Sequence, residues 1–298
     1  MKQFIRRMTN WLAPKALSYF QKKLSKKSPE AAEKWGEGLA SIWWTLGGRR
    51  KQTAIDNLAM AFPEMSLEDR TLLAKKVFLH FGRITADFLA SSGRPAEELA
   101  ADMDVEGREN LDAALSQGKG VLLLTGHFGN WERVSRWMSG MGYKLSVVAR
   151  DADQAKVNDA VNELRQETGT RVIPRGAAAR PILERLRDNE AVGILADQNS
   201  KEIFLPFFGH MAGTVLGPGV IAERSKCPVL GVSCVRTGVG RYKVVIGKPL
   251  EPLESDGPRG SGMMLAYHAW LEENITQYPD QWLWIHDRWR SARKKGLL

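Results

Sequence analysis

The sequence has little cysteine, no long hydrophobic run and no acidic residue near its start. Only Cys227 and Cys234 occur in 298 residues, and both lie in or beside an apolar strand pattern. Two cysteines exclude a disulfide framework and the cysteine pairs of common zinc motifs, so we expect core residues of a protein in a reducing compartment. The five histidines show no His-x-x-x-His spacing. No metal site is therefore expected.

No hydrophobic segment is long enough to cross a bilayer, which takes about 18 apolar residues. The nearest candidate, Leu39–Leu46, is far shorter and is followed by two glycines and the basic run Arg49-Arg50-Lys51. Its adjacent tryptophans, Trp43 and Trp44, suit the boundary of the lipid headgroups, because an indole ring has an apolar face and a polar edge. This pattern predicts peripheral or shallow attachment to a membrane from the cytoplasmic side.

The N-terminal residues are strongly basic within a chain of net charge +9. Residues 1–29 carry eight lysines or arginines and no acid. Apolar residues interleave with these charges at roughly helical spacing, namely Phe4, Ile5, Met8, Trp11, Leu12, Leu17 and Phe20. This pattern is typical of a helix on an anionic membrane surface, which attracts each basic residue by about 1 kcal/mol. We expect a membrane-surface segment over 1–48 and a single domain over 49–298.

Two other interpretations of the basic segment are a solvated tail and a nucleic-acid-binding arm. No aromatic RNA-binding signature, zinc finger or helix-turn-helix pattern follows it. Nucleic acid is therefore not an expected partner.

The rest of the chain alternates between strand and helix patterns. Helical periodicity covers 30–46, 50–61, 67–91, 130–141, 154–168, 177–188, 216–226 and 260–276. Strand patterns cover Val121–Thr125, Leu145–Ala149, Arg171–Ile173, Ala191–Ala196, Val229–Val235 and Tyr242–Ile246. This alternation predicts an α/β fold with a mostly parallel central sheet, helices on both faces and a helical N-terminal extension.

A histidine and a carboxylate lie where one strand pattern passes into a helix pattern, in the segment Gly126-His127-Phe128-Gly129-Asn130-Trp131-Glu132. Such junctions gather at the carboxyl edge of a parallel sheet, where ligands bind. An imidazole, with an ordinary pKa of about 6.5, can take a proton from a hydroxyl nucleophile. Glu132 could hold the ring and stabilise the imidazolium.

The spacing restricts how these two side chains can meet. On a continuous helix, residues five apart point about 140° away from each other. The pair therefore converges only if His127 lies in the turn and Glu132 in the first helical turn. The alternative is a hydrogen-bonded turn histidine and an ordinary acid that suits the helix dipole.

Several segments together resemble the late acyltransferases of lipid A biosynthesis, the lauroyl and myristoyl transferase branch of the lysophospholipid acyltransferase superfamily. The resemblance begins near residue 50 and is carried by Asn57-Leu58, Ala61-Phe62-Pro63-Glu64, Thr125–Glu132, Val172–Arg175, Leu195–Asn199, Pro206–Gly209 and Tyr278–Trp289. Members of this family usually begin with one hydrophobic anchor helix, and this chain has none of adequate length.

The resemblance implies a glycerolipid acyltransferase-like fold and transfer of a fatty acyl group to a hydroxyl of a lipid A precursor at the cell inner membrane. The acyl donor would be a thioester of acyl carrier protein or of coenzyme A, used as co-substrate with no further cofactor. His127 would then remove the proton of the acceptor hydroxyl, and Glu132 would orient His127. The Asn130 amide or backbone N–H groups of the following helix would stabilise the oxyanion.

The resemblance also suggests substrate-binding residues. Arg175 could hold a phosphate of the acceptor or of the donor's phosphopantetheine arm, and Arg150 and Arg165 are further cationic candidates. Asp197 and Gln198 end a strand at the same sheet edge and are expected to organise the site through hydrogen bonds.

Phe207 and Phe208 could line a channel for the acyl chain, although paired aromatics also suit a core. Tryptophans 282, 284 and 289 suit packing or an interfacial belt.

Two rival functions remain open at this point. The same chemistry could act on another lysolipid, aminolipid or glycolipid, because pocket shape decides the acceptor. Alternatively, the protein could be a non-catalytic membrane-binding scaffold.

Overall fold

The structure, a computed structural model, describes residues 15–149, 155–167 and 169–298. Seven strands form one sheet in the order β1-β9-β8-β2-β5-β3-β4. All neighbouring pairs are parallel except β8 and β9. The strands are β1 (Met103–Glu106), β2 (Val121–Thr125), β3 (Leu145–Ala149), β4 (Arg171–Pro174), β5 (Ala191–Leu195), β8 (Val229–Gly238) and β9 (Arg241–Pro249). The predicted mostly parallel α/β sheet is thereby confirmed.

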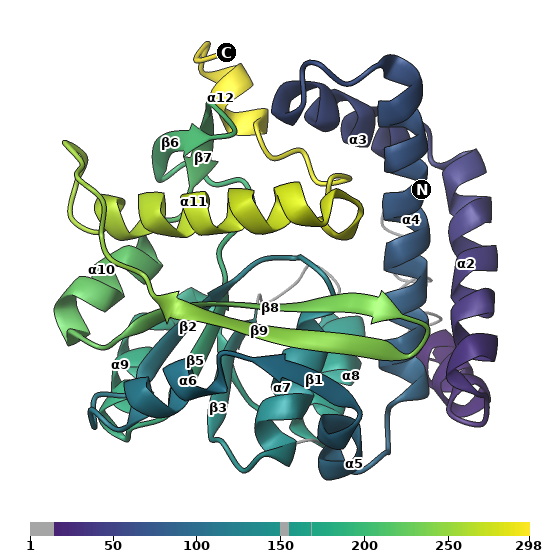
Figure 1. Cartoon of the computed structure of the whole chain (residues 1–298), viewed down its shortest axis with the longest axis horizontal. Coiled ribbons are helices and arrows are strands. Elements are labelled where there is room, and N and C mark those ends of the chain that lie inside the picture. Colours follow the sequence, from purple (N-terminus) through teal and green to yellow (C-terminus); the bar gives the residue numbers. More distant parts are fainter. Residues whose placement is uncertain (1–14, 150–154, 168) are drawn as a thin grey trace.

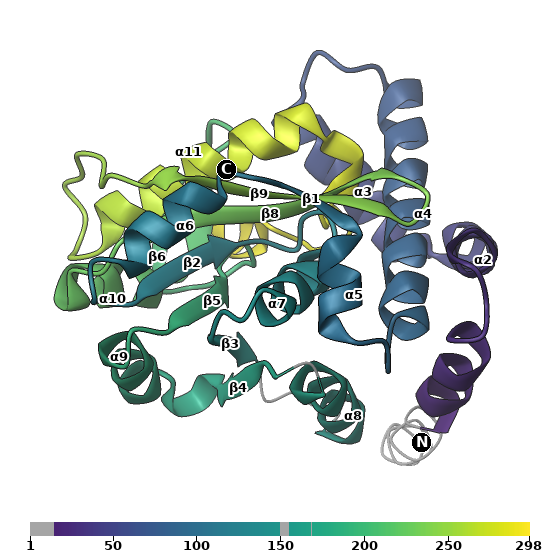
Figure 2. The same cartoon turned by 60° about the horizontal axis from the view of Figure 1, so that its bottom comes forward.

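Helices cover both faces of this sheet (Figures 1 and 2). Those that follow or precede strands are α5 (Ala96–Ala101), α6 (Arg108–Leu115), α7 (Trp131–Gly140), α8 (Ala155–Gln166), α9 (Ala179–Arg187), α10 (Gly217–Ser225) and α11 (Ser261–Gln277), and the short α12 (Arg290–Lys294) lies near the C-terminus. Side chains of β2 alternate between the two faces: Leu123 packs in the cluster with α7, and Leu122 and Leu124 pack in the cluster with α10 and α11. Both faces of the central strands are therefore buried, as their apolar sequences require.

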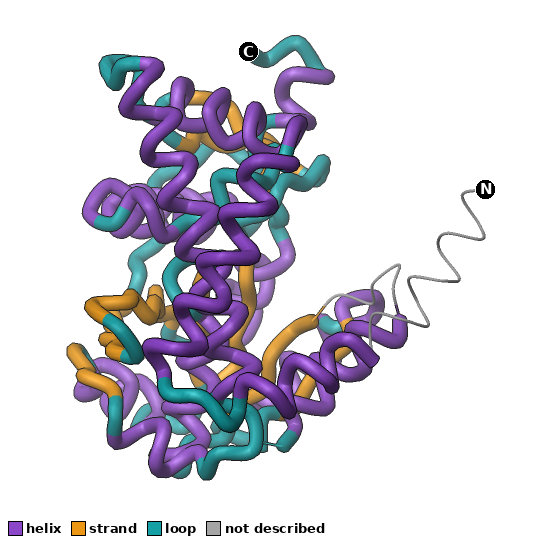
Figure 3. Tube along the Cα trace, turned by 90° about the vertical axis from the view of Figure 1, so that its right-hand side faces the viewer, coloured by secondary structure: helices purple, strands orange, loops and turns teal. Residues whose placement is uncertain are grey.

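The helical N-terminal part forms a layer beside the sheet. It contains α2 (Pro29–Leu46), α3 (Gly48–Ala61) and α4 (Leu67–Ala90), and from their side the helices lie in front of the strands (Figure 3). Helices α2 and α4 approach closely because Gly36 and Gly82 face each other; a Cβ on Gly36 would lie 2.2 Å from the Gly82 oxygen. A further helix covers 15–24. Leu17 and Phe20 of that helix pack into a small cluster with Trp35, so these two residues of the basic segment are committed to the fold.

The hairpin of β6 (Ile203–Phe207) and β7 (His210–Thr214) was not expected from the sequence. Its two connecting residues, Phe208 and Gly209, both have positive φ, which is the geometry of a tight hairpin turn. Phe207 is fully buried and its ring lies 5.6 Å from that of Trp282. Neither Phe207 nor Phe208 lines the cavity described below, so the interpretation of these residues as an acyl channel is wrong; they anchor a hairpin in the aromatic core.

Candidate active site

Two neighbouring parallel strands bring His127 and Asp197 together. Thr125, the last residue of β2, pairs in register with Leu195, the last residue of β5. His127 and Asp197 each lie two residues beyond these strand ends, so both reach the carboxyl edge of the sheet at the same point. This is the edge at which ligands bind in such folds.

Asp197 holds both the backbone and the ring of His127. His127 Nδ1 lies 2.8 Å from Asp197 Oδ1, and the His127 backbone N–H donates to Asp197 Oδ2 over 2.8 Å. The indole N–H of Trp282 also donates to Oδ2, over 3.0 Å. Since Nδ1 donates to the carboxylate, Nε2 is the unprotonated nitrogen and is available as a base.

The Asp197 carboxylate is ionised despite being 2% exposed. Burial alone would raise its pKa, but the positive charge that His127 carries when it is protonated, together with the hydrogen bonds from His127 and Trp282, outweighs this and holds the Asp197 pKa below its usual value. A buried carboxylate of this kind can stabilise the imidazolium that forms when His127 takes a proton.

The turn that carries His127 is fixed by contacts from three parts of the chain. Gly129 has φ +59, and a Cβ there would lie 2.0 Å from the Cys234 oxygen, so only glycine fits. Its N–H donates to the Gln281 oxygen over 2.9 Å, and the Leu283 N–H donates to the His127 oxygen over 3.1 Å. Burial lowers the pKa of His80 to about 3, so a neutral ring faces the Gly129 oxygen at 3.2 Å. The base is therefore held on a rigid loop.

Glu132 does not bond to His127, so the prediction that it orients this ring is wrong. Its carboxylate accepts hydrogen bonds from Arg165 Nε over 3.0 Å and from Arg165 Nη2 over 2.5 Å. It also accepts one from the Trp131 indole N–H over 3.0 Å. Glu132 is the second residue of α7, and its side chain bonds to Arg165 of α8 and not to His127. The orienting carboxylate comes from the neighbouring strand, which sequence spacing alone cannot indicate.

Asn130 is also not available to a substrate, contrary to its predicted role. It is 1% exposed, and its amide donates to the Asp87 carboxylate over 2.8 Å. Its backbone N–H donates to the Cys234 oxygen over 2.6 Å. Asn130 therefore fixes the turn, and oxyanion donors must be sought elsewhere.

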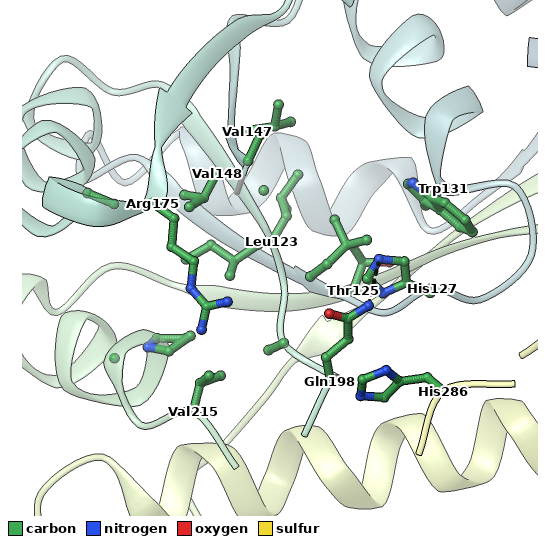
Figure 4. Close-up of a pocket in the computed structure, with 18 of the residues that line it drawn as sticks. Leu123, Thr125, His127, Trp131, Val147, Val148, Arg175, Gln198, Val215 and His286 are labelled. Atoms are coloured by element: carbon green, nitrogen blue, oxygen red, sulfur yellow. Dashed lines mark hydrogen bonds between the residues drawn. The ribbon is translucent and has the colours of Figure 1, made fainter. Parts of the chain in front are cut away.

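A cavity of about 1320 Å³ opens beside His127. His127, Trp131, Gln198 and His286 lie at one end of it, and the apolar side chains of Leu123, Val147 and Val148 line it farther along (Figure 4). Such a volume exceeds the several hundred Å³ of a typical small-molecule pocket. It provides space for substrates of lipid size next to a base.

The cationic candidates have different positions. Arg175 lines the cavity and points into it (Figure 4), and no ion pair joins it to a carboxylate among the described residues. Arg165 also lines the cavity but is bound to Glu132. Arg150 lies outside the described residues. Gln198 reaches His127, with its Nε2 3.5 Å from His127 Nε2.

His286 and Trp282 are site residues whose roles the sequence did not indicate. The Asn199 backbone N–H donates to His286 Nε2 over 3.0 Å. Burial lowers the pKa of His286 to about 4, so the ring is neutral and carries its proton on Nδ1. The run of tryptophans in this segment suggested packing, which hid the hydrogen bond from Trp282 to Asp197.

The site defines a class of protein. A histidine base with a buried carboxylate partner, at the strand ends of a mostly parallel α/β sheet and beside a large cavity with apolar and cationic lining, is suited to attack by a hydroxyl on an acyl group. The sequence model of the bacterial lipid A biosynthesis acyltransferases matches residues 8–291. The chain belongs to this family and is an O-acyltransferase.

Individual relatives are distant. The chain is 27% identical over 248 residues to the lipid A biosynthesis palmitoleoyltransferase of Escherichia coli, covering 82% of this chain and 79% of that protein. It is 25% identical over 200 residues to a phosphatidylinositol mannoside acyltransferase of Mycobacterium tuberculosis, covering 64% and 62% of the two chains. The crystal structure of a 1-acyl-sn-glycerophosphate acyltransferase from Thermotoga maritima matches with a TM-score of 0.41 and 14% identity, over 84% of this chain and 99% of that one.

Proposed function

We propose that the protein transfers a fatty acyl group from an acyl carrier protein thioester to a hydroxyl of a lipid A precursor at the cytoplasmic face of the inner membrane. The observation that carries this proposal is the His127–Asp197 pair at the mouth of a lipid-sized cavity, in a chain of this family. A coenzyme A thioester is the alternative donor. No further cofactor is required, because a thiol leaves readily.

In the proposed reaction, His127 Nε2 takes the proton of the acceptor hydroxyl while the hydroxyl oxygen bonds to the thioester carbonyl carbon. The C–S bond then breaks, and the departing thiolate takes the proton from the imidazolium, which Asp197 stabilises in the meantime. Candidate oxyanion donors are the Trp131 and Glu132 backbone N–H groups at the start of α7 and the protonated Nδ1 of His286.

Arg175 suits a phosphate. Its guanidinium projects into the cavity without a carboxylate partner, and a guanidinium forms two parallel hydrogen bonds with a phosphate group. The acceptor and the phosphopantetheine arm of the donor each carry this chemistry. We therefore assign Arg175 to phosphate binding in the proposed complex.

An exposed apolar stripe on α2 supports attachment to a membrane. Leu39, Ile42, Trp43 and Leu46 recur at positions i, i+3, i+4 and i+7 and are 48%, 58%, 40% and 78% exposed. The stripe ends three residues before Arg49, which lines the cavity. No helix of the described residues is long and apolar enough to span a bilayer. Insertion of this stripe into an anionic leaflet would place the cavity beside its lipid substrate.

We expect an Ile42→Ser/Leu46→Ser variant to bind vesicles of anionic phospholipid at least about tenfold more weakly than the wild type, since each change removes roughly 1–2 kcal/mol of apolar burial. Removal of residues 1–27 and added salt should weaken binding further through lost or screened charge. The matched control is Leu253→Ser, because Leu253 is 50% exposed in the loop between β9 and α11, at the opposite end of the molecule (Figure 1). If the α2 variant and the control bind the vesicles equally well, the stripe does not contact the membrane.

The function is tested by mass spectrometry of a lipid A precursor incubated with the purified protein and a mixture of acyl carrier protein thioesters. A gain of one acyl mass, absent with folded His127→Ala protein, is the expected result. The result that would refute lipid A as the acceptor is an unchanged mass of the precursor, obtained with wild-type protein that still hydrolyses the thioesters or transfers acyl groups to total membrane lipids. The mycobacterial relative, named for a mannoside acceptor, makes another glycolipid the second candidate.

A further inference from the structure

A glycine lies in the middle of β5, where a side chain would normally be expected. Gly193 pairs in register with Leu123 of β2 on one side and with Val147 of β3 on the other. Glycine weakens a central strand, and it usually marks a bulge, a positive φ or the close approach of another group. Gly231 of β8 illustrates the last case, since a Cβ there would lie 2.3 Å from the Trp270 ring.

None of these explanations holds for Gly193. Its φ is not positive, and the register with β2 continues through it without a shift. The atoms nearest to an added Cβ are Val147 Cγ1 at 3.5 Å, Leu145 Cδ1 at 3.8 Å and the Ser146 oxygen at 3.9 Å, which are ordinary contacts. A side chain would therefore fit, and the space beside Gly193 belongs to the cavity.

We call this part of the cavity the branch toward α7, because its lining side chains belong to the cluster on that side of the sheet. Leu123, Gly193 and Val147 form one row across three strands on the face toward α7, and Val134 of α7 lines the same space. Thr125 lies two residues beyond Leu123 on β2 and connects this row to the catalytic end. The row itself contains no polar side chain. Ile194, whose side chain packs on the opposite face of the sheet, and Arg175, in the turn after β4, line other parts of the cavity.

We infer that the branch toward α7 takes the fatty acyl chain of the donor and that Gly193 determines the longest chain it accepts. An acyl chain has no hydrogen-bonding group and requires an apolar wall, whereas the branch with Arg175 suits a phosphate-bearing substrate. A Cβ and any larger group at position 193 would occupy the floor of this branch. The inference rests on the acyl-transfer reaction of this site, and it is independent of which lipid accepts the chain.

The test measures binding of saturated fatty acids of graded length to full-length protein by titration calorimetry, and the chain-length profile of transfer from an equimolar mixture of acyl thioesters. Gly193→Ala, Gly193→Val and Gly193→Leu should move both profiles progressively toward shorter chains. Each methylene that no longer fits should cost roughly 10-fold or more in affinity and kcat/KM. Val147→Ala, which enlarges the same branch, should shift the profiles toward longer chains.

The matched control is Ala191→Val, because Ala191 lies two residues earlier on the same strand and face, is buried, and does not line the cavity. It should leave the ratio of long-chain to short-chain binding unchanged. Unfolding lowers binding of all lengths equally, so this ratio separates chain selection from damage to the fold. An unchanged ratio in folded Gly193→Leu, or an equal loss for all lengths, would overturn the inference. Fatty acid binding needs no acceptor, so a wrong acceptor assignment does not affect this result.

Discussion

Replacing His127 by alanine, or Asp197 by asparagine, is expected to lower kcat by roughly 10²- to 10⁴-fold, because each change disables the general base. Loss of the imidazole removes the proton acceptor. Asparagine at position 197 removes the negative charge that stabilises the imidazolium and no longer dictates that Nδ1 carries the proton. The double variant should be no slower than the slower single variant, since the two residues act as a unit. Steady-state transfer kinetics on folded variants would measure all three values.

Glu132→Gln distinguishes this assignment from the one that sequence spacing suggested. Glu132 bonds to Arg165 and Trp131, so its neutral isostere should reduce kcat far less than Asp197→Asn does. The opposite order, with Glu132→Gln the more damaging change, would show that His127 is oriented by Glu132 during the reaction. Circular dichroism and thermal unfolding of each variant would separate catalysis from folding.

The charge on Asp197 also affects stability at low pH. Its pKa is lower in the folded protein than in the unfolded chain, so it stabilises the fold above the ordinary carboxyl pKa of about 3.9. This contribution is lost as the pH falls through the lowered folded-state value. At neutral pH the carboxylate is ionised, which is the state required to support His127.

Local patterns in the sequence predicted the sheet and the position of the base. The alternation of apolar strands and amphipathic helices fixed β2, β3 and β5 within one residue, because buried parallel strands leave a strong hydrophobic signal. His127 was found because a reactive side chain followed such a strand directly. The segments that the sequence missed, such as β1 and β6–β7, are strands of four or five residues, whose hydrophobic pattern is too short to give a clear signal.

The partners of each site residue could not be predicted in the same way. Glu132 is five residues from His127 in sequence, yet Asp197, seventy residues away, makes the bond. That contact depends on β2 and β5 being neighbours in register, which follows from strand order and not from spacing. Likewise, Asn130 looked like an oxyanion donor because its buried partner, Asp87, belongs to a distant helix. The role of Gly193 could not be predicted from the sequence, because it depends on the position of this glycine beside the cavity.

Asp87→Ala is expected to reduce the free energy of unfolding by about 3–5 kcal/mol, the cost of breaking a buried ion pair from one side. Asp87 on α4 accepts two hydrogen bonds from Arg133 on α7, over 2.8 and 2.6 Å, and both side chains are less than a tenth exposed. It also accepts the Asn130 amide. A second buried cation, Arg136, lies near this pair, and burial together with the neighbouring Arg133 lowers its pKa to about 10. The variant would therefore leave both Arg133 and Arg136 without the Asp87 carboxylate.

The matched control is Glu37→Ala, which removes the carboxylate of a more exposed pair with Arg83, between α2 and α4 of the N-terminal layer. That change should cost at most about 1 kcal/mol, because water replaces the lost partner. Chemical denaturation of both variants gives the comparison, and equal effects would mean that Asp87 does not support the fold as described. Because Asn130 ends the turn that carries His127, the folded fraction of Asp87→Ala should also lose kcat. If the Asp87→Ala protein is as stable as the wild type but has a low kcat, Asp87 only positions the turn that carries His127. If its stability falls, Asp87 also attaches α4 to the catalytic sheet.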